Sequence, residues 1–185
     1  MLSPLRKSLL PHQRETVSFI KETGSCLIAH ECGNGKTRPV LVLLLEEQQS
    51  HPDRITLVVV PACIRAQWRA DLKRYGLGYV VIIISMETVA REGKEFRRVC
   101  DGVVFHRVVI DEIHLLGDKG RKAILGVLKG DPLRVALSGT PIVRHRKDLA
   151  NIAKFIGVST EVLMAERMLR SKIELALPPL DITEW

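Results

Sequence analysis

Five short apolar runs, each followed by an amphipathic stretch, constrain the fold of this chain more than any other feature of its sequence. The runs are apolar at neighbouring positions and not only at alternate ones, which is typical of strands buried on both faces. Strands of this kind that alternate with helices form a parallel sheet covered by helices, so the sequence predicts an α/β fold. The five predicted strands are Ser25 to Ala29, Ile55 to Val60, Tyr79 to Ile84, Phe105 to Ile110 and Arg134 to Leu137.

The amphipathic stretches predict the helices and the end of the folded lobe. The 185 residues suit one domain of ordinary size. From Glu161 we expect a helix to about Leu175, then a turn at Leu177-Pro178-Pro179-Leu180, and no further pair of strand and helix. The sequence therefore predicts a single lobe over residues 1–160 and a connector over residues 161–185. The earlier helices are expected to begin near His12, Thr37, Cys63, Met86, Lys119 and Lys147.

Composition limits the location and the partners of the chain. No apolar run approaches the roughly 18 residues that span a bilayer, and no secretory signal is evident, so no membrane partner is expected. The four cysteines are scattered without zinc spacing, which predicts free thiols and no structural metal. We expect an intracellular protein of a reducing compartment, the cytoplasm or nucleus, with a viral origin also compatible. The net charge of +7 fits a polyanionic partner, although it also fits solubility alone.

A glycine-bearing loop follows the first predicted strand and precedes an aliphatic helix. It reads His30-Glu31-Cys32-Gly33-Asn34-Gly35-Lys36-Thr37. Its glycines let backbone N–H groups point at a phosphate, and the helix adds the positive end of its dipole. Lys36 would then face the β- and γ-phosphates, and the Thr37 hydroxyl would bind Mg²⁺. His30 stands where the full pattern has its first glycine, so a glycine turn without a ligand remains the alternative.

Two consecutive acids directly follow the fourth predicted strand. The apolar Val108 to Ile110 runs into Asp111-Glu112-Ile113-His114. Because successive side chains of a strand point to opposite faces, Asp111 and Glu112 are expected to have separate tasks. At the carboxyl end of a strand beside a phosphate loop, one carboxylate can hold magnesium and the next can orient the attacking water. A solvated turn is the alternative, and the partnership with Lys36 favours the catalytic interpretation.

Six motifs in order now resemble the first, N-terminal, RecA-like motor lobe of superfamily-two helicases. The Ser-Gly-Thr-Pro sequence, with a helix after it, is most similar to the Swi/Snf family of ATP-dependent DNA translocases. This chain departs from the family at His30-Glu31-Cys32, where Asp-Glu-Met is common, at Asn34 and at His12. The matching segments are Leu9 to Gln13, Gly33 to Thr37, Val58 to Pro61 with Gln67-Trp68, Ser85 to Thr88, Asp111 to His114 and Ser138 to Pro141.

The resemblance implies a P-loop NTPase lobe that binds ATP and Mg²⁺. Gln13 would recognise adenine, Thr37 and Asp111 would hold the metal, and Glu112 would orient water. Catalysis would therefore rest on Lys36, Asp111 and Glu112. The cofactor-binding residues implied are Gln13, Gly33, Asn34, Gly35, Lys36 and Thr37.

The resemblance also implies residues that couple the nucleotide to movement and residues that contact DNA. The coupling set comprises His114, Ser138, Gly139 and Thr140, and the nucleic-acid set comprises Arg65, Ser85 and Thr88. Arg65 recurs with Arg69 and Lys73 at a spacing of four, which forms one basic helix face, although such a face is more often simply solvated. Trp68 is expected to be a packing residue.

The implied activity is ATP hydrolysis coupled to movement on duplex DNA. In this family a second motor lobe supplies arginine fingers, so the 185 residues are expected to hydrolyse ATP weakly until another chain or missing sequence provides that lobe. Few aromatic residues are present for stacking single-stranded bases, which favours a duplex. Two alternatives stay open: a nucleotide-dependent protein-interaction module without efficient turnover, and an RNA helicase lobe, which usually shows Ser-Ala-Thr where this chain has Ser-Gly-Thr-Pro.

Overall fold

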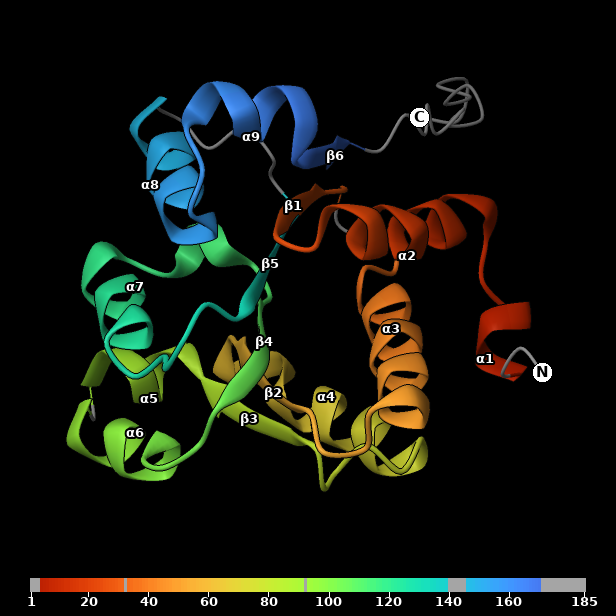
Figure 1. The fold of residues 1–185 in the computed structure, drawn as a ribbon, viewed down its shortest axis with the longest axis horizontal. Helices are drawn as coiled ribbons and strands as arrows, with labels where there is room; N and C mark the ends of the chain where they lie inside the picture. Colours follow the sequence, from red (N-terminus) through yellow and green to blue (C-terminus); the bar gives the residue numbers. More distant parts are fainter. Residues whose placement is uncertain (1–3, 32, 92, 140–145, 171–185) are drawn as a thin grey trace, which may run out of the picture.

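Six parallel strands form the centre of the computed structural model, which describes residues 4–31, 33–91, 93–139 and 146–170 (Figure 1). Their order across the sheet is β3-β2-β4-β5-β1-β6, and every neighbouring pair is parallel. This all-parallel sheet confirms the predicted α/β class. The strands are β1 (Cys26–Ala29), β2 (Ile55–Val60), β3 (Val81–Ser85), β4 (Phe105–Ile110), β5 (Leu133–Ser138) and β6 (Met168–Arg170).

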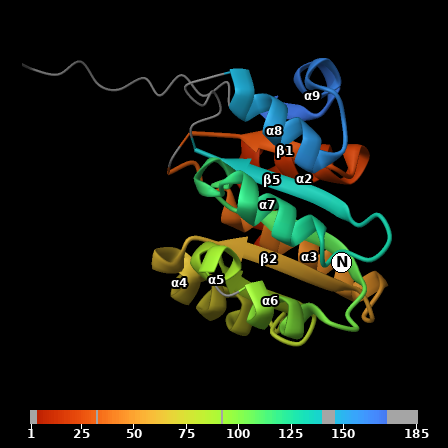
Figure 2. The same ribbon diagram turned by 90° about the vertical axis from the view of Figure 1, so that its left-hand side faces the viewer.

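Helices cover both faces of the sheet (Figure 2). Helices α1 (Pro4–Lys7), α2 (Pro11–Thr23), α3 (Thr37–Ser50) and α4 (Ala62–Arg74) contribute to one apolar cluster. The other cluster includes residues of α5 (Met86–Arg91), α6 (Gly93–Cys100), α7 (Asp118–Leu125), α8 (Arg146–Ile156), α9 (Thr160–Glu166) and the short 3₁₀ helix η1 (Ile113–Leu115). None of the helices in the described ranges is long and apolar enough to cross a membrane.

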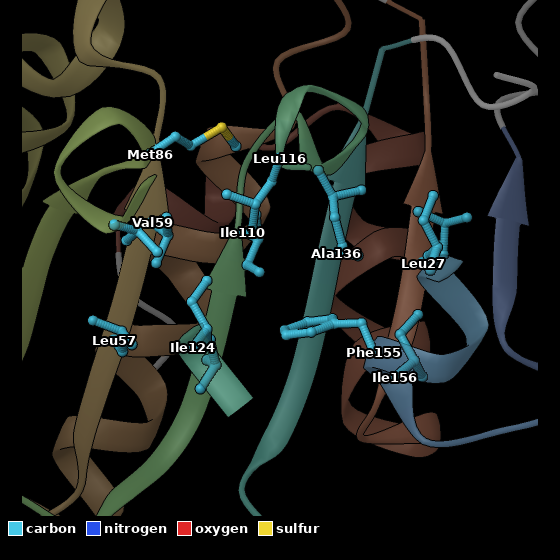
Figure 3. Packing of buried hydrophobic residues seen from close by; sticks show 14 of the residues in the cluster. Leu27, Leu57, Val59, Met86, Ile110, Leu116, Ile124, Ala136, Phe155 and Ile156 are labelled. Carbon is cyan, nitrogen blue, oxygen red and sulfur yellow. The ribbon is translucent and has the colours of Figure 1, made fainter. Parts of the chain in front are cut away.

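The consecutive apolar residues of each strand divide between these two clusters. Leu57 and Val59 of β2 pack with α5 to α9, whereas Val58 and Val60 pack with α1 to α4. Figure 3 shows Ile110 and Ala136 of neighbouring strands with Phe155 of α8. Side chains alternate between the faces of a strand, so an unbroken apolar run is what a doubly covered sheet requires.

The strands and helices predicted before the connector are confirmed. All five predicted strands exist, and the largest difference at a strand start is at β3, which begins at Val81 and not at Tyr79. The six predicted helices begin within one residue of their expected positions. Helix α6 was not foreseen, because a single helix was expected after β3 where the chain forms α5 and then α6.

The predicted extent of the helix from Glu161 to about Leu175 is wrong. Helix α9 ends at Glu166, and β6 follows and pairs with β1, with Leu27 opposite Met168 and Ala29 opposite Arg170. A strand of three residues is too short to show a periodic pattern, which is why the sequence did not reveal it. The boundary at residue 160 stays a prediction, and the Pro178-Pro179 turn lies outside the described residues.

Candidate nucleotide site

The loop between β1 and α3 depends on two glycines in the left-handed backbone region. Gly33 has φ 87° and Gly35 has φ 64°, which side-chain-bearing residues rarely adopt. A Cβ atom at Gly35 would also lie only 2.6 Å from Nε2 of Gln13. The loop ends at Lys36, which directly precedes Thr37, the first residue of α3. This is the strand, glycine loop and helix arrangement that binds phosphate.

Lys36 points inward from this loop and is only 8% exposed. Its Nζ donates to the backbone carbonyls of His30 at 3.1 Å and Glu31 at 3.3 Å. The same Nζ lies 3.7 Å from Oε1 of Glu112. The phosphate loop and the acidic pair, which are more than 70 residues apart in the chain, therefore meet in one place, as predicted.

Asp111 follows β4 and is held by the neighbouring β2–α4 segment. Its backbone N–H donates to the Val59 carbonyl at 2.9 Å, and its Oδ2 accepts from Trp68 Nε1 at 3.0 Å. Burial raises the pKa of this carboxyl, and Glu112 adds to the increase, while the Trp68 hydrogen bond and Lys36 oppose it. The carboxylate is thus enclosed, with its charge only partly compensated by the protein.

Glu112 faces a different set of partners, as predicted, although both acids lie just beyond the end of β4 and not within the strand. Its Oε2 accepts the Gly139 N–H at 2.8 Å and lies 3.4 Å from Nδ1 of His114. His114 Nδ1 is also 3.0 Å from the Ser138 hydroxyl. Glu112 has a left-handed backbone, with φ 52°, which is strained for a residue with a side chain. Two of the predicted coupling residues, His114 and Gly139, thus contact Glu112 directly, and Ser138 contacts His114. The fourth, Thr140, lies outside the described residues.

Gln13 is buried beneath the phosphate loop. Its Nε2 donates to the carbonyls of Asn34 at 3.4 Å and Gly35 at 3.3 Å, and its Oε1 accepts from the Leu10 N–H at 3.0 Å. His12 Nε2 is also 3.2 Å from the Asn34 carbonyl. In this conformation Gln13 supports the loop, and its recognition of adenine stays a prediction.

Two of the predicted nucleic-acid residues bond to each other. The Ser85 hydroxyl is 2.9 Å from that of Thr88 and accepts the Thr88 N–H at 3.2 Å, so it satisfies a free donor at the start of α5. Ser85 is 4% exposed, which leaves little of it for a ligand. Arg65 is half-buried on α4. Contact of these three residues with a nucleic acid stays a prediction.

The donor set fits magnesium. Mg²⁺ prefers hard oxygen ligands, and Thr37 and Asp111 offer a hydroxyl and a carboxylate. The Thr37 hydroxyl makes no hydrogen bond within the part of the chain that the structure describes. A bound cation would also supply the compensation that the buried Asp111 carboxylate lacks. When bound, magnesium would neutralise charge on the phosphates that Lys36 is predicted to face.

His30 was noted in the sequence only as a departure from the family pattern, and the structure gives it a distinct environment. Its side chain is 2% exposed, and its ring centroid is 6.2 Å from that of His12. Burial, His12 and Lys36 lower the pKa of His30 from 6.5 to about 4. His30 is therefore neutral at physiological pH, which keeps a second positive charge away from Lys36.

This environment predicts a pH-dependent loss of stability. The unfolded chain takes up a proton on His30 below pH 6.5, whereas the folded chain does so only near pH 4, so stability falls as the pH falls through that window. The loss attributable to His30 should approach about 3 kcal/mol. Urea unfolding of the natural chain and His30→Gln at pH 7.5 and pH 4.5 measures it. The variant should lose less stability than the natural chain, with the exposed His51→Gln as control, and equal losses in all three chains would contradict the prediction.

Comparison with known proteins places these residues in a wider context. Residues 76–162 match the SNF2-related domain. The ATP-dependent helicase rhp16 of Schizosaccharomyces pombe is 29% identical over an alignment of 194 positions that covers 80% of this chain and 22% of the relative. The human DNA annealing helicase and endonuclease ZRANB3 is 22% identical over an alignment of 170 positions that covers 78% of this chain and 15% of the relative. The chain thus spans less than a quarter of the length of these relatives.

Solved structures share the fold. The Sulfolobus solfataricus SWI2/SNF2 ATPase core, solved in complex with dsDNA, matches with a TM-score of 0.71 and 21% identity, over 92% of this chain and 45% of that chain. The UvsW helicase from bacteriophage T4 matches with a TM-score of 0.64 and 18% identity, over 88% of this chain and 60% of that chain. The arrangement of sheet and helices is therefore that of a RecA-like lobe.

Proposed function

We propose, from the match of residues 76–162 to the SNF2-related domain and from the RecA-like fold, that this chain is the ATP-binding lobe of a motor that couples ATP hydrolysis to movement on duplex DNA. The observation that carries the proposal is the 3.7 Å approach of Lys36 Nζ to Glu112 Oε1, with Asp111 beside it. A phosphate-facing cation, a metal-binding carboxylate and a water-orienting carboxylate are what phosphoryl transfer from ATP requires.

Each residue of the site then has a task. Lys36 binds the β- and γ-phosphates, and Gly33, Asn34 and Gly35 supply backbone around them. Thr37 and Asp111 hold magnesium, and Glu112 orients the attacking water. Gln13 supports the loop and recognises adenine.

Coupling to movement would pass through Glu112. Its Oε2 is bonded to the Gly139 N–H, and its neighbour His114 is bonded to Ser138. If Glu112 turns toward a water beside the γ-phosphate, the Gly139 amide loses its acceptor. The segment after β5, which includes Thr140, would then respond to the state of the nucleotide.

The proposed DNA surface includes α4 and the start of α5. Three cations lie along α4: Arg65, which is half-buried, and Arg69 and Lys73, which are exposed. The Glu87 carboxylate of α5 accepts the Ala62 N–H at the start of α4, with Oε2 at 3.0 Å, so the two segments are held together. Cations along a helix suit the phosphate backbone of a duplex, and such binding should weaken as salt rises. In support, the Sulfolobus core was solved in complex with dsDNA.

Efficient turnover would need a second lobe. This chain matches 45% of the Sulfolobus core, which fits one lobe of two. An arginine finger from another lobe is worth roughly 10³ to 10⁵ in rate, or on the order of 4 to 7 kcal/mol of transition-state stabilisation. We therefore expect the 185 residues to bind ATP and to turn it over slowly.

Turnover with different nucleic acids tests the proposal. ATP hydrolysis by the 185-residue chain should be slow with duplex DNA, single-stranded DNA or RNA. A candidate second-lobe chain should raise it by at least a thousandfold, with duplex DNA as the best activator. Brisk turnover by the chain alone would contradict the need for a second lobe, and preferential activation by RNA would indicate an RNA helicase lobe. ATP binding without turnover under every condition would indicate an interaction module.

A further inference from the structure

The indole of Trp68 connects α4 to the carboxylate proposed to bind magnesium. We propose that Trp68 is a positioning residue, which fixes the Asp111 carboxylate in the orientation that magnesium requires. The inference rests on the proposed function and adds a residue to its metal site. Trp68 would act through Asp111 and would touch neither the metal nor the nucleotide.

The hydrogen bond between the two residues is enclosed. Trp68 Nε1 lies 3.0 Å from Asp111 Oδ2, and the residues are 1% and 5% exposed. The indole packs in the same apolar cluster as Val60, Leu72 and Val109, which restrains its ring. A buried indole N–H without an acceptor is costly, so this donor holds its carboxylate oxygen firmly.

Asp111 is anchored to the β2–α4 segment at two points. The main chain is fixed where its N–H donates to the Val59 carbonyl, and the side chain is fixed by Trp68. With both ends held, the carboxylate has little freedom to rotate. A preset carboxylate binds a metal with less loss of conformational entropy than a free one.

A packing role alone would make a different prediction, and Trp68→Phe separates the two. Phenylalanine keeps an aromatic ring in the core and removes only the N–H donor and part of the ring. Outer-shell partners of metal ligands typically contribute 10- to 100-fold in metal affinity. We expect the magnesium concentration for half-maximal tightening of nucleotide binding to rise about tenfold. Nucleotide affinity in EDTA should remain unchanged.

The experiment titrates MgCl₂ into the chain with a fluorescent ATP analogue. Leu72→Ala is the matched control, because Leu72 is a buried residue of the same helix and cluster that has no bond to Asp111. The control should lower the melting temperature without changing the magnesium midpoint. In an Asp111→Asn background, Trp68→Phe should cause no further change in the midpoint, since the two residues act as one unit.

Two results of the magnesium titration would overturn the inference, and a third concerns the proposed function. The inference would be overturned if Trp68→Phe had the same magnesium midpoint as the natural chain. It would also be overturned if the variant lost nucleotide affinity equally in magnesium and in EDTA. If the natural chain shows no magnesium-dependent nucleotide binding, the proposed function itself fails, whatever Trp68 does.

A second measurement does not require the Trp68 variant to fold. The chain has two tryptophans, so Trp185→Phe leaves one indole N–H resonance, that of Trp68. In ¹⁵N-labelled protein this resonance should move upfield when Asp111→Asn weakens the acceptor. It should also move when Mg²⁺ and nucleotide bind. An indole resonance that ignores Asp111→Asn would show that the bond does not form in solution and would overturn the inference.

Discussion

Replacing Lys36 with alanine should reduce the affinity of the chain for ATP by at least a hundredfold. Hydrogen bonds to charged groups contribute about 1.5 to 3 kcal/mol each, and the proposed role of the amine implies two of them to the phosphates. Its present acceptors are the neutral carbonyls of His30 and Glu31, which anionic phosphate oxygens can displace. Isothermal titration calorimetry with ATP or ADP measures the loss.

Controls separate this effect from damage to the loop. Lys21 pairs with Glu46 on another part of the surface, so Lys21→Ala removes one positive charge without touching the loop. This control should bind ATP as the natural chain does. The melting temperature of Lys36→Ala shows whether the fold is kept, since Glu112 still has Gly139 and His114 beside it. Natural affinity in a folded Lys36→Ala variant would refute the assignment of the phosphate loop.

Glu112→Gln should leave ATP binding intact and slow hydrolysis by roughly 10² to 10⁴, the usual contribution of a group that activates water. Glutamine keeps an oxygen that can accept the Gly139 N–H, so the local structure should persist. Its amide cannot take up a proton from the attacking water. Single-turnover hydrolysis, measured with the second lobe present, should show ATP retained on the protein.

The pair of variants tests the division of tasks between the two segments. Lys36→Ala should lose binding, whereas Glu112→Gln should lose only the chemical step. Equal losses of ATP affinity in both variants would show that Glu112 serves in binding and that its water-orienting assignment is wrong. Hydrolysis at the natural rate in Glu112→Gln would lead to the same conclusion.

The sequence predicts the fold well because its main signals are local. Buried parallel strands show as apolar runs, and a glycine-rich turn before a helix shows as Gly33 to Lys36, so each can be identified without knowing what packs against it. The strand β6 could not be identified this way. It has three residues, and it becomes a strand only because β1 lies beside it.

The tertiary partners of the site residues were harder to predict. Trp68 and His30 carry no local pattern that indicates what they face, and Trp68 was expected only to pack. The indole of Trp68 bonds to a residue 43 positions away, and His30, which follows β1, lies beside His12 of α2. The bond between the Ser85 hydroxyl and Thr88 was likewise not foreseen, and the contact of Ser85 with nucleic acid stays a prediction. Short motifs therefore predict which segments converge, while hydrogen bonds between distant residues require the fold.

The strand that carries the phosphate loop is also the strand that β6 adjoins. Leu27 to Ala29 pair in register with Met168 to Arg170, and the Leu27 N–H donates to the Arg167 carbonyl at 2.7 Å. The two strands are parallel. Tension applied beyond Arg170 along the axis of β6 would therefore load the hydrogen bonds between the strands in shear, and all of these bonds would resist it together. A pull from that side would reach the base of the loop within a few residues, without passing through the helices.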